Sequence, residues 1–144
     1  MENLNDLSDE ELLIACLWAE ARGEPESGQQ AVCNVILNRV KKRMAVSIRD
    51  VILKRNQFSW TNPNDVNYKK VFTAQTDSPE SWGRASKIAH MALANTLEDL
   101  SKNADHYLNV ELTKRIRGGS LPNWVDLSKV TAVIGNHTFL NLLG

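Results

Sequence analysis

The sequence predicts a single, mainly α domain with a small β-hairpin element. Three observations support this fold class. Apolar residues recur with a helical period through most of the chain, one short hairpin pattern lies near its end, and no linker, repeat or low-complexity segment divides its 144 residues. A chain of this length is long enough to bury a core of its own. We therefore expect one domain that spans residues 1–144.

The first predicted helix has the best-defined ends. Ser8 followed by Glu11 forms a capping-box pattern at its start, and Gly23 ends it. From Leu12 to Ala21, Glu20 is the one charged or strongly polar residue. A helix that is apolar nearly all round is expected in the middle of a domain, packed on several sides.

The next helices are predicted from their start signals and apolar faces. One should run from about residue 26 to residue 42, with Arg39 on its apolar side. A buried arginine needs a partner, and Glu24 is one candidate. A short helix should begin after Ser47, and Ser78-Pro79 is a good N-cap and first-turn pair for another.

The last third of the chain is less regular. Residues 105–110 fit either a strand or an extended loop, and Gly118-Gly119 indicates a turn. Residues 133–139 have the pattern of a small hairpin with Gly135-Asn136 at the turn. The β element is therefore expected to be minor.

Charge and apolar patterning exclude several classes of protein. The 17 Lys and Arg residues balance 17 Asp and Glu residues, so no basic stripe predicts nucleic-acid binding. No apolar run approaches the roughly 20 residues of a membrane span, so we expect no stable membrane insertion. Residues 1–6 are acidic and polar without the pattern of a signal peptide, which predicts synthesis in the cytoplasm. Cys16 and Cys33 lie in apolar helix patterns and are expected to be buried free thiols, with a disulfide as the alternative.

Glu20 is the leading candidate for chemistry. The apolar face around it, the low dielectric of a central helix and the negative end of that helix all raise the pKa of a carboxyl group. A carboxyl group that keeps its proton near neutral pH can protonate a poor leaving group. The alternative is a structural glutamate paired with Arg22 or Arg39. Glu24 is expected either to support the second helix, as an N-cap or in an ion pair, or to act as a second carboxylate beside Glu20.

A second set of candidates combines polar groups with aromatic neighbours. This mixture suits sugar binding, because hydroxyls need hydrogen-bond partners and ring faces need flat surfaces. The alternative for the Phe and Trp residues is an ordinary core or surface role. The set comprises Gln57, Phe58, Ser59, Trp60, Tyr107, Asn109 and Trp124.

Metal and nucleophile chemistry have weaker patterns. His90, His106 and His137 with Asp105 could in principle bind zinc, but no pair has the His-Glu-x-x-His spacing. No Gly-x-Ser-x-Gly motif is present, and the cysteines are expected to be buried. We therefore predict no metal and no other cofactor.

Several motifs resemble a known family. The run from Ala19 to Pro25, with Gly28-Gln29 and the segment 31–40, resembles the opening block of cell wall hydrolases related to the spore-cortex-lytic enzyme. The resemblance extends over residues 12–140, nearly the whole chain. Later motifs follow in the family's order, namely Gln57-Phe58-Ser59-Trp60, the Tyr107 region, Asn123-Trp124 and Ile134-Gly135-x-His137-x-Phe139.

The resemblance implies a lysozyme-like α+β fold of the lytic-transglycosylase type. It also implies cleavage of the β-1,4 bond between N-acetylmuramic acid and N-acetylglucosamine in peptidoglycan, with Glu20 as the catalytic glutamate. Tyr107 would lie in the cleft and donate a hydrogen bond to Glu20. The substrate-binding or supporting residues that it suggests are Glu24, Gln57, Phe58, Ser59, Tyr107, Asn109, Trp124 and His137.

In the implied reaction, Glu20 first protonates the glycosidic oxygen. It then acts as a base for the muramic 6-hydroxyl, which closes a 1,6-anhydro ring. Hydrolysis would normally use a second carboxylate, for which Glu24 and Asp105 are candidates. Neither reaction requires a metal. Two other functions stay open, a zinc-dependent N-acetylmuramoyl amidase and a non-catalytic glycan-binding domain.

The biological setting is also predicted by resemblance. Secreted relatives carry export signals and often wall-binding repeats, and the sequence has neither pattern. A bare catalytic domain of this kind resembles a bacteriophage endolysin, which reaches the cell wall after a holin opens the inner membrane. We therefore expect a monomeric lytic enzyme whose partners are the glycan strands of peptidoglycan.

Overall fold

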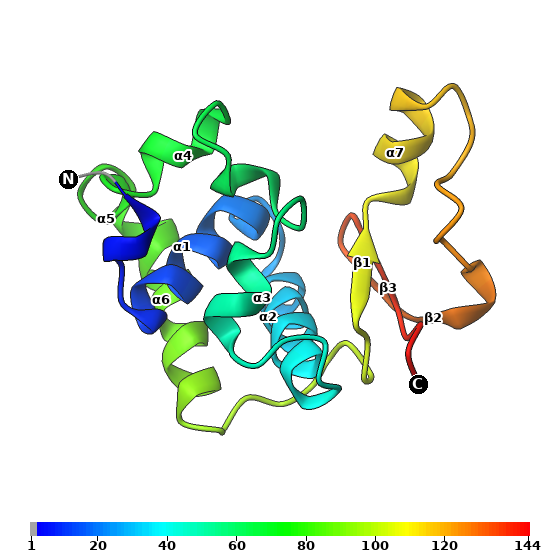
Figure 1. Ribbon diagram of the computed structural model, residues 1–144, viewed down its shortest axis with the longest axis horizontal. Coiled ribbons are helices and arrows are strands. Elements are labelled where there is room, and N and C mark those ends of the chain that lie inside the picture. The colour runs from blue at the N-terminus through cyan, green and yellow to red at the C-terminus, as the bar shows by residue number, and fades with distance from the viewer. Residues whose placement is uncertain (1–2) are drawn as a thin grey trace.

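The computed structural model describes residues 3–144, so Met1 and Glu2 of the acidic N-terminal segment lie outside the described residues. Helices α1 to α6 form a helical body, and a three-stranded sheet with helix α7 lies beside it (Figure 1). The predicted fold class is confirmed. In chain order the elements are η1 (Leu4–Asp6), α1 (Asp9–Ala21), α2 (Glu26–Lys41), α3 (Ile48–Leu53), η2 (Ser59–Thr61), α4 (Val66–Lys70), α5 (Ala74–Asp77), α6 (Pro79–Leu93), β1 (His106–Leu108), α7 (Val110–Ile116), η3 (Leu127–Lys129), β2 (Val130–Ile134) and β3 (His137–Leu140).

Helix α1 forms the centre of the helical body. Its capping box is complete, because Ser8 Oγ accepts from the Glu11 N–H at 3.1 Å and Glu11 Oε1 accepts from the Ser8 N–H at 2.9 Å. All residues from Leu12 to Trp18 are buried, and α1 packs against α2, α3 and α6. The apolar pattern of this helix therefore predicted its central place correctly.

Helix α2 packs against α1, α3, α6 and the sheet. It has the expected span, but its N-cap residue is Pro25 rather than Glu24. The expected ion pair between Arg39 and Glu24 is wrong. Arg39 is buried and donates instead to the backbone carbonyl of Asp105 at 2.8 Å and to Gln57 Oε1 at 3.1 Å. Neutral oxygens therefore accept these two guanidinium hydrogen bonds.

The start signals of α3 and α6 have different outcomes. Ser47 caps α3 as expected, because its side chain accepts from the Asp50 N–H at 3.2 Å. Pro79 begins α6 as expected, but the Ser78 side chain makes no capping hydrogen bond within residues 3–144. The Ser78 backbone has a ψ of 61°, outside the extended region from which a cap side chain reaches the free N–H groups.

The sheet has the strand order β1-β3-β2, and both pairings are antiparallel. Gly135-Asn136 connects β2 to β3 as predicted, with a φ of 58° at Gly135, a region that glycine adopts readily. Residues 106–108 form a strand rather than a loop, and Tyr107 pairs with Phe139. The β element is thus one strand larger than the predicted hairpin, because β1 adds to β3.

The core lies mostly in the helical body. Phe58 and Trp60 are buried in it, which gives both rings the core role named as their alternative. Cys16 and Cys33 are buried free thiols, so that prediction is confirmed. Within residues 3–144, the structure has no helix with the length and apolar character needed to span a bilayer.

Candidate active site

Glu20 lies in the last turn of α1, where the helix leaves the core. Its side chain accepts a hydrogen bond from the Tyr107 hydroxyl, with 2.6 Å between Tyr107 Oη and Glu20 Oε1. Tyr107 belongs to β1, so this bond joins the helical body to the sheet. The hydroxyl fixes one oxygen of the carboxyl group, as the family resemblance implied.

The surroundings raise the pKa of Glu20 above its ordinary value. Burial is the largest cause, because it disfavours the charged form. The hydrogen bond from Tyr107 and the charge of Arg39 lower the pKa, whereas the negative charge of Asp65 raises it further. Glu20 therefore keeps its proton closer to neutral pH than an exposed glutamate does.

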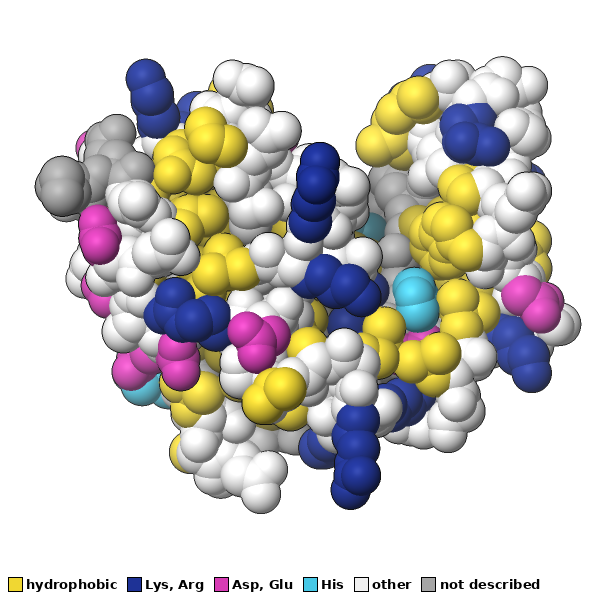
Figure 2. Space-filling model, viewed as in Figure 1, with side chains coloured by type: hydrophobic (Ala, Val, Ile, Leu, Met, Phe, Trp, Pro, Cys, Tyr) yellow, Lys and Arg dark blue, Asp and Glu magenta, His cyan; other side chains and the backbone are white. Residues whose placement is uncertain are grey.

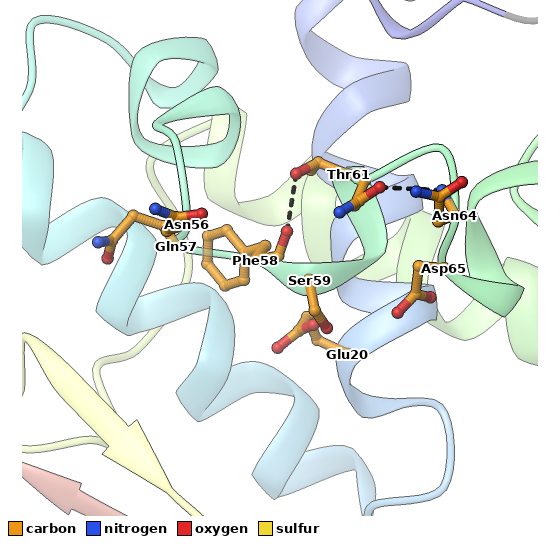
Figure 3. Close-up of a pocket in the computed structure, with 9 residues that line it drawn as sticks. Glu20, Asn56, Gln57, Phe58, Ser59, Thr61, Asn64 and Asp65 are labelled. Carbon is orange, nitrogen blue, oxygen red and sulfur yellow. Dashed lines mark hydrogen bonds between the residues drawn. The ribbon is translucent and has the colours of Figure 1, made fainter. Parts of the chain in front are cut away.

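Glu20 faces a polar pocket of about 580 Å³ (Figure 3). The loop after α3, the short helix η2 and the start of α4 form its walls. Figure 3 shows the Ser59 and Asp65 side chains beside Glu20. The residues that line the pocket are Glu20, Asn56, Gln57, Phe58, Ser59, Thr61, Asn62, Asn64 and Asp65.

The pocket wall is braced by short-range hydrogen bonds. Thr61 Oγ1 donates to the Phe58 carbonyl at 2.7 Å, and Asn62 Oδ1 accepts from the Asn64 N–H at 2.9 Å. Gln57 is held from behind, because its Oε1 accepts from the buried Arg39. These contacts order a segment that otherwise consists of turns.

The surface is hollowed between the helical body and the part that carries α7 (Figure 2). Glu20 comes from the first of these parts and Tyr107 from the second. The Glu20–Tyr107 pair therefore lies where the two parts of the molecule meet.

Glu24 lies outside the lining of this pocket and contacts the β2–β3 turn. Its Oε1 accepts from the Asn136 N–H at 2.8 Å, and its Oε2 accepts from Asn136 Nδ2 at 3.0 Å. The nearest ionisable partner is His137, with 3.9 Å between its Nδ1 and Glu24 Oε1. Both carboxylate oxygens of Glu24 are thus engaged by the turn.

Asp105 is fully buried, which contradicts its expected role as a second carboxylate for an attacking water. Lys42 Nζ donates to its Oδ2 at 2.8 Å and His106 Nδ1 hydrogen-bonds its Oδ1 at 2.7 Å. The backbone N–H groups of Leu142 and Leu143 each donate at 2.9 Å. Burial raises the pKa of Asp105, but these four contacts outweigh it and hold the pKa below its usual range. The role of Asp105 is to fasten the C-terminal segment to α2 and β1.

The remaining predicted residues lie apart from the pocket. The Asn109 side chain caps α7 by accepting from the Leu112 N–H at 2.9 Å. Trp124 is exposed and its ring centroid lies 5.5 Å from that of His106. His137 packs against Tyr107 with 4.9 Å between ring centroids.

Five residues that line the pocket were not predicted from the sequence. They share a polar stretch that looks like an ordinary loop, and their approach to Glu20 depends on how that loop folds back over α1. Asp65 had a local signal, because it stands before Val66 as the N-cap of α4 and accepts from the Asn67 N–H at 2.9 Å. The five are Asn56, Thr61, Asn62, Asn64 and Asp65.

The zinc hypothesis required a cluster of ligating side chains. Among residues 3–144, no group of three or more His, Cys, Asp or Glu side chains is arranged to hold a metal ion. His106 is instead tied to Asp105, and the exposed His90 pairs with Glu10.

A mostly helical fold with a small sheet and a largely buried carboxyl group at a polar pocket fits the lysozyme-like class of enzyme that the sequence predicted. A family model described as cell wall hydrolase matches residues 23–140. The chain therefore belongs to the cell wall hydrolase family. Both the predicted family and the prediction that the chain is an enzyme of this kind are confirmed.

Individual relatives agree with this assignment. The chain is 28% identical over 140 residues to the spore cortex-lytic enzyme of Oceanobacillus iheyensis, a match that covers 92% of this chain and 41% of that protein. The chain thus spans about two fifths of the length of that curated relative.

Two solved structures share the fold. One is the catalytic domain of the germination-specific lytic transglycosylase SleB from Bacillus anthracis, with a TM-score of 0.67, 25% identity and coverage of 95% of this chain and 98% of that chain. The other is the catalytic domain of the Bacillus cereus SleB protein, with a TM-score of 0.65, 25% identity and coverage of 92% and 89%.

Proposed function

We propose that this protein cleaves the β-1,4 bond between N-acetylmuramic acid and N-acetylglucosamine in peptidoglycan, as a lytic transglycosylase. One observation carries the proposal. Glu20 has a raised pKa, is held by the Tyr107 hydroxyl and faces a pocket lined by amide and hydroxyl side chains. Such side chains suit the hydroxyl and acetamido groups of a sugar. The family assignment and the likeness to a lytic transglycosylase support the same reaction.

In the first step, protonated Glu20 donates its proton to the glycosidic oxygen. The bond between that oxygen and the muramic C1 breaks, and positive charge develops on the muramic ring. Glu20 is left as a carboxylate, which the Tyr107 hydroxyl stabilises by its hydrogen bond. The negative charge of Asp65 in the same pocket favours the cationic sugar.

In the second step, the Glu20 carboxylate takes the proton of the muramic 6-hydroxyl. The oxygen of that hydroxyl forms a bond to C1 and closes the 1,6-anhydro ring. Glu20 is protonated again by the hydrogen of the 6-hydroxyl, while its first proton leaves with the departing sugar, so one carboxyl group serves both steps. The substrate supplies the nucleophile, and the reaction consumes no water.

Hydrolysis is the second candidate reaction, and the position of Asp65 in the pocket favours it. Asp65 is a carboxylate in the same pocket as Glu20 and influences the pKa of Glu20 by its charge. It is the member of the pocket lining that would assist a water or stabilise the charge on the sugar in a muramidase.

The test is replacement of Glu20 by Gln. Glu20→Gln keeps the shape of the side chain and its capacity to accept from Tyr107, but cannot supply the proton. We expect at least a 100-fold loss of activity on purified peptidoglycan, given the contribution of general acid catalysis. Glu26→Gln is the matched control, because Glu26 is an exposed glutamate in the first turn of α2. Wall degradation by Glu20→Gln at the parent rate would contradict the proposal.

Mass spectrometry of the products separates the candidate reactions. A transglycosylase gives muropeptides one water lighter than those of a muramidase. An amidase would instead release stem peptides from intact glycan strands, and a binding domain would release nothing.

The biological role in bacterial lysis is a separate part of the proposal. Action in bacterial lysis as a phage endolysin, after synthesis in the cytoplasm and release through a holin, stays a prediction, as does the monomeric state. Expression in a bacterium with and without a co-expressed holin tests it, and lysis that needs the holin is the expected result.

A further inference from the structure

The β2–β3 turn is attached to the α1–α2 loop through Glu24. Each oxygen of its carboxylate accepts one hydrogen bond from Asn136, at 2.8 Å from the N–H and 3.0 Å from Nδ2. The Glu24 side chain is only 9% exposed. This two-point contact fixes both the position and the orientation of the turn.

The turn is shaped for close approach to Glu24. A Cβ atom at Gly135 would lie 2.5 Å from Glu24 Oε1 and 2.9 Å from Pro25 Cδ, and the φ of 58° also favours glycine. Behind the turn, Gly28 at the start of α2 lies against both Glu24 and Ile134, with 3.3 Å from a Cβ position to Glu24 Cβ and 3.6 Å to Ile134 Cγ2. The end of the hairpin therefore packs directly on the segment that follows Glu20.

The turn continues into β3, which packs against the tyrosine that hydrogen-bonds Glu20. His137, the first residue of β3, packs on Tyr107 with 4.9 Å between centroids, and Phe139 pairs with Tyr107 across the strands at 5.8 Å. His137 Nδ1 is buried without a hydrogen-bond partner among residues 3–144 and lies 3.9 Å from Glu24 Oε1. The ring of His137 thus separates Glu24 from the Tyr107 ring.

We propose that Glu24 is a positioning residue for the Glu20–Tyr107 pair. Through Asn136 it locks the β2–β3 turn, and through His137 it determines where the Tyr107 ring lies relative to Glu20. The two glutamates of the Ala19–Pro25 motif then have different tasks on the same site. Glu20 transfers the proton, and Glu24 keeps the tyrosine of the sheet within hydrogen-bond reach of it. This inference rests on the proposed function of Glu20.

The test is a double-mutant cycle of Glu24→Ala and Tyr107→Phe on soluble, uncrosslinked glycan strands. Glu24→Ala should lower kcat by roughly tenfold with little change in KM, since small misplacements of catalytic groups have effects of that order or larger. Tyr107→Phe should then lower kcat by a clearly smaller factor in the Glu24→Ala background than in the parent, because the hydroxyl is already misplaced there. Glu26→Ala is the control for loss of a nearby negative charge and should leave the parent kcat unchanged.

The pH profile distinguishes positioning from a general loss of structure. Three charged or ionisable groups act on Glu20: Tyr107 from β1, Asp65 from the start of α4 and Arg39 from α2. A weaker Tyr107 hydrogen bond raises the pKa of Glu20, so the high-pH limb of kcat should move upward in Glu24→Ala. A loss of folded protein would lower the rate at every pH without moving this limb.

The inference would be overturned if Tyr107→Phe lowered kcat by the same factor in both backgrounds, or if the high-pH limb of kcat did not move in Glu24→Ala. If Glu24→Ala does not fold, Asn136→Asp takes its place, because it sets a carboxylate against Glu24 at an exposed turn position. The same loss of kcat and the same limb shift are then expected, and unchanged values overturn the inference. Failure of the proposed function is a different result, namely an active Glu20→Gln variant.

Discussion

Replacing Tyr107 with phenylalanine removes one hydroxyl group and leaves the ring in place. The ring packs against His137 and Phe139, so the sheet should keep its structure. The hydroxyl donates a hydrogen bond to Glu20 Oε1, with 2.6 Å between the two oxygens. The variant therefore isolates the contribution of that bond to the acid.

The magnitude follows from the difference between two hydrogen bonds. A bond to a charged group contributes about 1.5–3 kcal/mol and a bond between neutral groups about 0.5–1.5 kcal/mol. Loss of the hydroxyl thus disfavours the Glu20 carboxylate relative to the protonated acid by about 1–1.5 kcal/mol, which raises the pKa of Glu20. The direction follows from the sign of the interaction, because a donor to the carboxylate lowers the pKa of Glu20.

The rate should show two effects that oppose each other near neutral pH. The raised pKa keeps more of Glu20 protonated, so the high-pH limb of kcat moves to higher pH. The loss of positioning lowers the maximum of kcat by roughly tenfold. Rates must therefore be recorded across the whole pH range, together with the carboxyl chemical shift of Glu20 measured by NMR. A limb that stays in place or moves down in folded Tyr107→Phe would refute the reasoning.

Three further predictions concern charge, stability and metal. Asp65→Asn removes the negative charge that raises the pKa of Glu20, so the high-pH limb of kcat should move down, opposite to Tyr107→Phe. Lys42→Met leaves the buried carboxylate of Asp105 without its cation and should lower the free energy of unfolding by about 3 kcal/mol, measured in urea. The full destabilisation by Lys42→Met should be seen above the unfolded-state pKa of about 4. It should disappear as the pH falls through the lower folded-state pKa of Asp105. Treatment with EDTA should leave wall degradation unchanged, because the Glu20 mechanism uses protons alone; loss of activity restored by zinc would support the amidase.

The features predicted well from the sequence are those with local signals. The capping box at Ser8 and the apolar run from Leu12 identified α1, and the same run placed Glu20 at its polar end. The Gly135-Asn136 turn was recognisable because few residues other than glycine accept its backbone conformation. In each case neighbours within a few residues carry the information.

The features that the sequence did not predict depend on tertiary contacts. One partner of Arg39 is the backbone carbonyl of Asp105, and no side-chain pattern in the sequence reports such an acceptor. Asp105 was a candidate carboxylate by sequence, but Lys42 and the backbone of residues 142–143, which are distant in the sequence, donate to it in the fold. Asp65 was not predicted because its local signal is that of a helix N-cap, which does not indicate that the side chain faces Glu20.

Three carboxyl groups near this site have different properties because their hydrogen-bond donors differ. Asp105 has four donors, including a lysine, so it stays ionised even though it is buried. Glu24 has the two donors of Asn136, which attach its carboxylate to the β2–β3 turn. Glu20 has the hydroxyl of Tyr107, which is too little to offset burial, and so its pKa is raised. A further strong donor placed at Glu20 should therefore lower its pKa and abolish the acid step while leaving the fold intact.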